Sequence, residues 1–191
     1  MKKMKILCGA ALGLLLAACG SQPVEPTYYL LRPAHDMQTR EMSPSSDFAL
    51  GRIVIAPYLD QSGMLLETRS GEIRAARSHL WAEPMYEAVH SYLVQEISRA
   101  KGEDVFPEKL NPDAAVVEVR IDQLHGTVNG QARLVAYWWL RQNGDVLAAY
   151  QFSESLTQAQ DGYGALVNAE RALLTQLAEK IAASMIVPAS S

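Results

Sequence analysis

Residues 117–154 decide the fold, and they read VEVRIDQLHGTVNGQARLVAYWWLRQNGDVLAAYQFSE. Val117, Val119 and Ile121 alternate with charged residues, which is typical of a strand with one buried face. Asn129-Gly130 and Asn143-Gly144 separate this run from two further runs, 131–141 and 145–154. Asn-Gly supplies the positive φ angles that a type I′ hairpin turn requires. The stretch therefore predicts three consecutive antiparallel strands, a meander.

Four shorter strands are expected upstream of this meander, at 28–31, 52–57, 64–69 and 72–76. Ser70-Gly71 is expected to form the hairpin turn between the last two. Residues 32–47 are polar and rich in residues that interrupt helices and strands, so we expect a flexible loop there.

Two helices complete the pattern. Pro84 suits the first position of a helix, because the N–H that proline lacks would be unpaired there. Apolar residues then recur at helical spacing up to Lys101-Gly102, and a second helix is expected over 163–186. The expected inner faces carry Met85, Val89, Tyr92, Leu93, Ile97 and Ala100 in the first helix, and Leu166, Leu173, Leu177 and Ile181 in the second. The order strands, helix, strands, helix predicts an α+β fold: an antiparallel β-sheet packed on one face by two α-helices.

The amino terminus has the pattern of a signal peptide. Three lysines precede an apolar run, 6–16, that is shorter than the ~20 residues a membrane-spanning helix needs. Leu16-Ala17-Ala18-Cys19 resembles the lipobox of bacterial lipoproteins, in which cleavage occurs just before the cysteine. The resemblance implies that Cys19 becomes the first residue and carries a diacylglycerol and an acyl group such as palmitate. Two or more buried chains hold a soluble domain firmly on a membrane.

The residues after Cys19 indicate where the protein is located and how the chain divides into segments. Gly20-Ser21 lacks the aspartate that resembles an inner-membrane retention signal, so the expected location is the periplasmic face of the outer membrane. We expect residues 1–18 to be the removed signal peptide and 19–27 a lipidated, proline-containing tether. Residues 28–187 then form a single domain, and 188–191 form a tail.

The cysteine content and the net charge exclude several kinds of site and partner. Cys8 leaves with the signal peptide and Cys19 carries lipid, so no thiol remains for a disulfide, a metal site or a nucleophile. The full chain has a net charge of −4, and loss of the signal lysines makes the remainder more acidic. An acidic domain is a poor partner for nucleic acid.

No catalytic pattern stands out. His35, His79, His90 and His125 are not at metal-ligand spacings, and the chain has no nucleophile elbow, P-loop or dinucleotide fingerprint. Carboxylates such as Asp60 and Glu67 could face each other across a strand pair, but surface carboxylates usually have no chemical role. We therefore expect no catalytic residues, no metal and no cofactor besides the lipid on Cys19, although distant segments can still assemble an acid–base pair.

The aromatic run AYWWLR suggests a second kind of surface. Strand alternation sends Trp138 to one face of the sheet, and Tyr137 and Trp139 to the other. If helices cover the first face, the second either lies under the long loop or shows aromatic rings to a partner. Large exposed apolar patches mark such binding sites.

Several of these segments together resemble a known family. YYLL soon after a lipobox, APYLDQSGMLLETRSGEIRAARSHLWAEPMYEAV in the middle of the chain, and QDGY before a long helix are similar to the auxiliary lipoproteins of ABC-type transport systems, in particular the PqiC (YmbA) family of the Pqi systems. The likeness runs from Tyr28 to about Met185 and is weakest over 32–50.

The resemblance implies a function and a partner. Pqi-type systems pair inner-membrane proteins with a periplasm-spanning MCE-domain protein of the PqiB type, which is thought to carry lipids between membranes. The lipoprotein is implied to dock that protein at the outer membrane, without catalysis. A lipid-binding periplasmic carrier and an outer-membrane assembly lipoprotein stay open as alternatives, and so does homo-oligomerisation. A docking subunit needs no internal cavity, and two helices over one sheet are expected to leave little room for one.

Polar and aromatic residues crowd the segment from 58 to 84, so we expect the partner surface there. The expected residues are Tyr58, Asp60, Arg69, Trp81, Glu83 and Pro84. Trp81 has a structural alternative, since it could close the start of the helix as a hydrophobic staple. Arg69 could simply pair with a neighbouring carboxylate.

Overall fold

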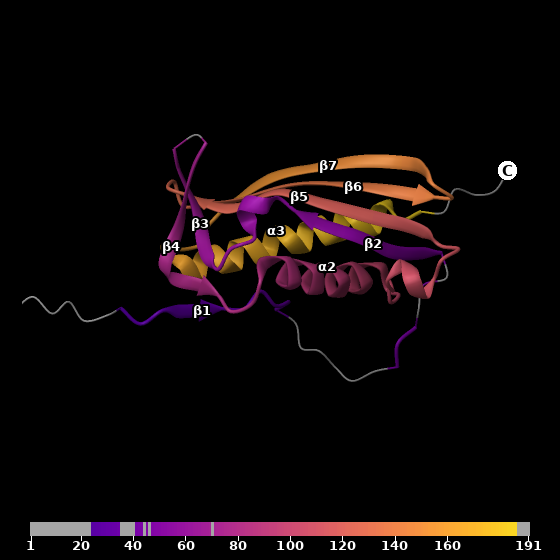
Figure 1. Ribbon diagram of the computed structural model, residues 1–191, viewed down its shortest axis with the longest axis horizontal. Coiled ribbons are helices and arrows are strands. Elements are labelled where there is room, and N and C mark those ends of the chain that lie inside the picture. Colours follow the sequence, from indigo (N-terminus) through magenta and orange to yellow (C-terminus); the bar gives the residue numbers. More distant parts are fainter. Residues whose placement is uncertain (1–23, 35–40, 44, 46, 70, 187–191) are drawn as a thin grey trace, which may run out of the picture.

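The computed structural model describes residues 24–34, 41–43, 45, 47–69 and 71–186 (Figure 1). The predicted signal peptide, Cys19 and most of the tether lie outside these residues, as do His35 and the 188–191 tail.

One seven-stranded sheet runs through the chain in the order β1-β4-β3-β5-β6-β7, and β2 also pairs with β5. Two helices, α2 (Met85–Lys101) and α3 (Tyr163–Ser184), lie side by side on one face of the sheet (Figure 1). The predicted α+β class is therefore confirmed. The strands are β1 (Thr27–Tyr29), β2 (Phe48–Ile55), β3 (Gly63–Arg69), β4 (Glu72–Trp81), β5 (Ala115–Thr127), β6 (Gln131–Gln142) and β7 (Asp145–Thr157), with 3₁₀ turns η2 (Pro57–Leu59) and η3 (Glu108–Leu110).

The last three strands pair antiparallel in chain order. Val119 lies opposite Trp138, and Trp138 lies opposite Tyr150. The turn residues Gly130, Asn143 and Gly144 have φ angles of 70°, 52° and 90°. At the second turn both Asn143 and Gly144 are left-handed, as a type I′ turn requires. At the first turn Gly130 is left-handed and Asn129 is not, so the expectation of a type I′ turn fails there.

The sheet as a whole is mixed, so the expectation of an antiparallel sheet is wrong. β1 pairs with β4 in parallel, and β5 pairs in parallel with both β2 and β3. Parallel neighbours need a long crossover connection, and α2 supplies it between the β3–β4 hairpin and β5. Hairpin signals in a sequence show the antiparallel pairs only.

Several element ends differ from the sequence prediction. β2 starts at Phe48 and β4 continues to Trp81, because β5 and β1 provide distant pairing partners. β1 ends at Tyr29 and α3 ends at Ser184. Pro84 is the residue just before α2, where its carbonyl accepts a hydrogen bond from the Ala88 N–H at 3.0 Å.

A single core lies between the helices and the sheet. Every predicted inner-face residue of the two helices is buried except Ala100, which is exposed near the end of α2. At Gly126 of β5 the neighbouring side chains are so close that a Cβ would lie 2.6 Å from Leu66 Cδ2 of β3 and 2.9 Å from Leu166 Cδ2 of α3. No helix among the described residues is long and apolar enough to cross a membrane.

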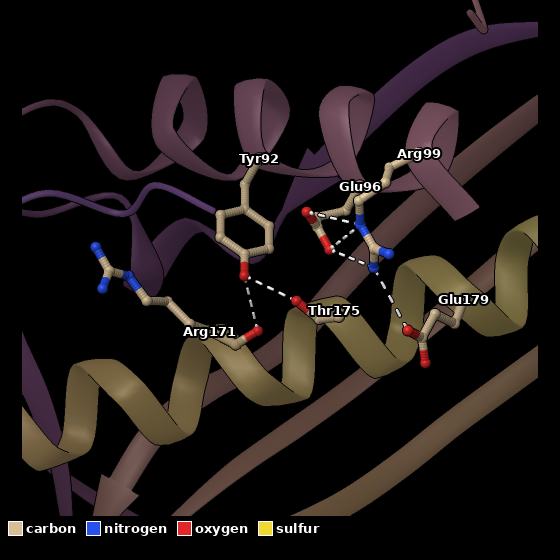
Figure 2. Close-up of polar contacts among 6 residues, drawn as sticks. All are labelled: Tyr92, Glu96, Arg99, Arg171, Thr175 and Glu179. Carbon is tan, nitrogen blue, oxygen red and sulfur yellow. Dashed lines mark hydrogen bonds and ion pairs between the residues drawn. The ribbon is translucent and has the colours of Figure 1, made fainter. Parts of the chain in front are cut away.

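Polar contacts join the two helices across their outer edge (Figure 2). The Tyr92 hydroxyl donates to the Arg171 carbonyl at 3.0 Å and shares a hydrogen bond of 2.9 Å with Thr175 Oγ1. The buried Glu96 carboxylate accepts from Arg99 at 3.0 Å, and Arg99 also reaches Glu179 of α3 at 3.4 Å. Arg99 thus bridges one carboxylate on each helix.

Part of the expected flexible loop is held in place. The Ser43 N–H donates to Asp104 Oδ2 at 2.7 Å, and the Ser45 N–H donates to the Asp104 carbonyl at 2.8 Å. Asp104 lies just after α2, so these described loop residues lie beside the helical layer. They do not lie over the opposite face of the sheet.

Candidate functional site

The strand that follows the tether is fastened to the folded domain. β1, here called the anchor strand, begins eight residues after Cys19 and pairs in parallel with the end of β4. Tyr29 shares a hydrogen bond with His79 Nδ1 at 3.1 Å, and the His79 ring stacks on Tyr163 at the start of α3 with centroids 4.1 Å apart. Leu31 is only 1% exposed and belongs to the core.

Hydrogen bonds from two arginines also hold the residues that follow the anchor strand. Arg32 donates two hydrogen bonds to Glu83 at the entrance to α2, one of them 2.9 Å long. The guanidinium holds the pKa of the Glu83 carboxyl below its usual value. Arg171 of α3 donates to the Leu30 carbonyl at 3.0 Å. These contacts, here called the anchor-strand clamp, tie residues 29–32 to β4, to the start of α2 and to α3.

The predicted partner residues fall into separate groups. The Tyr58 hydroxyl donates to the Asp122 carbonyl at 3.1 Å, and burial raises the Tyr58 pKa to about 12, with smaller contributions from Asp122 and Glu67. Asp60 is exposed at the end of η2. Glu83 belongs to the anchor-strand clamp described above.

Arg69 lies far from the other predicted residues. Gly63 pairs with Leu80 at one end of the β3–β4 hairpin, and Arg69 pairs with Glu72 at the other. Six residues of extended β3 separate Arg69 from Gly63, on the order of 20 Å. The hairpin tip projects beyond the sheet on the side away from the helices (Figure 1). Arg69 forms a weak ion pair with Glu72 there, at 3.8 Å.

Trp81 is buried, whereas Pro84 is exposed just before α2. The Trp81 side chain is 5% exposed and packs in the core. The Trp81 backbone N–H donates to the Ser62 carbonyl at 2.7 Å, which joins the ends of β3 and β4. Sequence alone cannot separate a core tryptophan from an interface tryptophan at a strand end, because both are large and amphipathic.

The outer face of the sheet is charged as well as aromatic. Ala136, Trp138 and Leu140 are buried under the helices, and Tyr137 and Trp139 are half-buried on the opposite face. Trp139 lines a shallow depression of about 460 Å³. The arginines around it are Arg52, Arg120 and Arg141, with Glu118 bonded to Arg141 at 3.2 Å. This face of the sheet is therefore not purely apolar.

An apolar cleft of about 630 Å³ lies on the helical side of the sheet. Its floor is the inner face of β6 and β7, where the Trp138 and Tyr150 rings stack 5.0 Å apart, and its wall is the last turn of α3. Trp138 Nε1 donates to Ser184 Oγ at 2.9 Å, so the indole N–H is satisfied. The expectation of little room for a cavity is therefore wrong: the helices cover the centre of the sheet and leave this end open.

The described residues offer little reactive chemistry. They contain no group of three His, Cys, Asp or Glu side chains that could hold a metal ion. Glu67 is ion-paired with Arg133 at 3.6 Å on a strand, whereas Asp60 lies outside the strands. Burial raises the pKa of Glu170 to about 8, but this carboxyl lies in the core on the inner side of α3.

Sequence reasoning missed the anchor-strand clamp and the cleft. Arg32 and His79 meet their partners Glu83 and Tyr29 across about 50 residues of chain, which no local pattern reveals. The cleft had a weak signal: Val146 and Leu147 are consecutive apolar residues, where a strand with one solvent-exposed face should alternate.

Comparison with known proteins places this fold among envelope lipoproteins. The chain is 25% identical over 185 residues to the intermembrane transport lipoprotein PqiC of Escherichia coli (strain K12), covering 95% of this chain and 96% of the relative. This agrees with the resemblance found in the sequence.

Two solved structures share the fold. The crystal structure of an uncharacterized protein has a TM-score of 0.73 at 22% identity, covering 85% of this chain and 99% of that one. A protein from Xanthomonas campestris has a TM-score of 0.63 at 15% identity, covering 81% and 91%. The profile of the ABC-type transport auxiliary lipoprotein component matches residues 28–182, from the anchor strand to the last turn of α3, and the chain therefore belongs to this family.

Proposed function

We propose that the protein is the outer-membrane lipoprotein subunit of a Pqi-type MCE intermembrane lipid transport system. In this role it docks the periplasm-spanning MCE-domain protein, of the PqiB type, at the outer membrane. Family membership supports a transport role, and the lipobox at Cys19 supports a lipid anchor. The role is non-catalytic and needs no cofactor besides the acyl groups on Cys19.

The anchor-strand clamp is the observation that carries the docking role. A docking subunit must transmit a mechanical connection from the lipid to the folded domain. β1 begins eight residues after Cys19, a reach of about 25 Å. From there Leu31 in the core and the Arg32–Glu83 pair hold the chain to β4 and α2. Binding of the MCE protein to such a domain would hold its end against the membrane, so that hydrophobic cargo need not cross water.

Co-purification from envelope membranes tests this proposal. The acylated protein should recover the MCE protein without stoichiometric lipid, and a Cys19→Ala copy should lose its membrane attachment. If the acylated protein recovers phospholipid and no MCE protein, the docking role is excluded.

The same experiment locates the partner surface. Because the structure separates the predicted residues, Asp60→Ala, Arg69→Ala and Glu83→Ala belong in separate variants. Loss of the MCE protein with Arg69→Ala alone would assign the hairpin tip, and loss with Asp60→Ala would assign the η2 end. Unchanged recovery with all three would exclude this surface.

A lipid-binding carrier is the second candidate, because the apolar cleft favours it. Small-molecule sites are typically 300–1,000 Å³ and mostly apolar, and the cleft of about 630 Å³ falls in that range. This candidate predicts bound lipid in the purified protein, with or without the MCE protein.

A further inference from the structure

We propose that the β7 edge, from Ala148 to Phe152, and the apolar cleft beside it bind an extended segment of a partner protein as an added antiparallel strand. The segment would place apolar side chains, at every second position, in the cleft. This inference rests on the proposed docking function and deepens it, because it names the kind of segment that the docked partner supplies.

The two outer edges of the sheet differ in how they are protected. Proteins shield exposed edges with short strands, lysine, proline, bulges or inward-pointing charges. The anchor strand at one edge has only three residues, so it offers few unpaired backbone groups to another chain. β7 at the other edge has 13 residues, DVLAAYQFSESLT, without lysine, arginine or proline. Among the described strands only β6 pairs with it.

The protection that β7 does have leaves its middle part open. A register irregularity opposite Leu140 and Arg141 interrupts the pairing near Val146. Glu154 lies opposite the buried Leu134, so its charge points toward the helical side. Between these features, Ala148 to Phe152 pairs with β6 without interruption. This is the part of the edge that borders the cleft.

The cleft supplies what an added strand needs beyond backbone hydrogen bonds. In strand addition, main-chain bonds provide affinity and pockets for alternate side chains provide specificity. Leu147, Ala148 and Tyr150 of β7 line the cleft, and Leu147 is 49% exposed. A strand beside β7 would continue the floor of the sheet, so its inward side chains would fill the space between the edge and the end of α3.

The charge of the cleft argues for a peptide over an anionic lipid. Its ionisable lining residues are Asp47, Asp113 and Lys180, a formal charge of −1, and Asp145 lies at the start of β7. A phosphate or carboxylate headgroup would meet net negative charge there, whereas a segment flanked by lysine or arginine would be attracted. A lipid chain would also leave the β7 backbone groups unpaired.

Hydrogen exchange on the full acylated protein tests the proposal, with and without the co-purified MCE protein. We expect the backbone amides of 148–152 that point away from β6, one residue in two, to exchange at least about tenfold more slowly in the complex, while the amides near Arg69 do not change. Ala148→Lys, which puts a charge into the cleft, should abolish this protection and reduce MCE recovery. Ser153→Lys, an exposed position on the outer face of the same strand just beyond the proposed site, is the matched control and should retain both.

A second variant and a cross-link distinguish a loss of binding from a loss of folding. Leu147→Asp alters an exposed side chain and should act like Ala148→Lys, with each variant first shown to unfold at the wild-type temperature. A photo-reactive residue at Gln151 should cross-link to an extended MCE-protein segment with alternating apolar residues.

The remaining outcomes overturn the inference in distinguishable ways. Equal MCE recovery by all variants, with unprotected β7 amides, excludes the strand site and leaves docking intact. No MCE recovery by the wild type excludes docking and this inference together. Protection of β7 without the MCE protein assigns the edge to a second copy, and phospholipid that is lost with Ala148→Lys assigns the cleft to a lipid chain.

Discussion

Glu170 is a carboxyl group in the core, on the inner side of α3. The residue is buried, and its Oε2 atom has no hydrogen-bond partner among the described residues. Burial disfavours the ionised form and raises the pKa of Glu170 from 4.5 to about 8. Between these two pH values the unfolded chain releases a proton that the folded chain keeps. The free energy of unfolding therefore falls as the pH rises, by about 1.4 kcal/mol per pH unit.

Glu170→Gln should remove this pH dependence. Glutamine has nearly the same shape and cannot ionise, so we expect the variant to be more stable than the wild type at pH 7, by on the order of 1–3 kcal/mol. The difference should shrink as the pH falls and vanish about one pH unit below 4.5, where the Glu170 carboxyl is protonated in both the folded and the unfolded wild type. Urea unfolding between about pH 3.5 and 8 measures this.

The exposed Glu87→Gln, at the start of α2, is the control and should follow the wild type. If the free energy of unfolding depends on pH in the same way for Glu170→Gln and the wild type, the Glu170 carboxyl is solvated or paired.

At the scale of elements, α2 and α3 are joined by polar contacts placed beside an apolar interface. Tyr92 bonds to two α3 residues, and burial raises the pKa of its hydroxyl. Arg99 bridges Glu96 and Glu179, and its own pKa is raised, mainly by the hydrogen bond to Glu96. Apolar packing tolerates sliding of one helix along the other, whereas these bonds require one register. They therefore fix the register of α2 relative to α3.

Tyr92→Phe should loosen this register. The variant keeps the ring in the core and removes two hydrogen bonds, so we expect a loss of about 1–2 kcal/mol in the free energy of unfolding. Amides of α2 and α3 should exchange faster, in step with each other. Tyr86→Phe is the matched control, because Tyr86 lies on α2 with an exposed ring. An equal loss in both variants would show that the α3 contacts contribute nothing specific.

At the scale of the whole molecule, the described core begins just after the anchor strand. Its first residue is Leu31 and its last is Met185. The anchor strand thus marks the amino-terminal boundary of the core.

Two shortened chains test where this boundary lies. A chain that starts at Val24 keeps β1, Leu31 and the Arg32–Glu83 pair, so we expect the thermal unfolding midpoint of the full-length Cys19→Ala protein. A chain that starts at Arg32 loses β1 and Leu31, and should be destabilised by about 2–5 kcal/mol, the typical cost of removing a buried leucine side chain. Equal midpoints for the two chains would show that β1 is not fastened to the domain.

The sequence by itself determined the α+β class, the Asn-Gly turns, the inner faces of both helices apart from Ala100, and the family. Each of these depends on residues close together in the chain: turn residues with special φ angles, or apolar residues at a fixed spacing. Only the tertiary structure decided the parallel pairings of β1 and β2, the burial of Trp81, the distance of Arg69 from the other predicted residues and the open cleft. These depend on which distant segments meet, and a local pattern is the same whichever partner covers it.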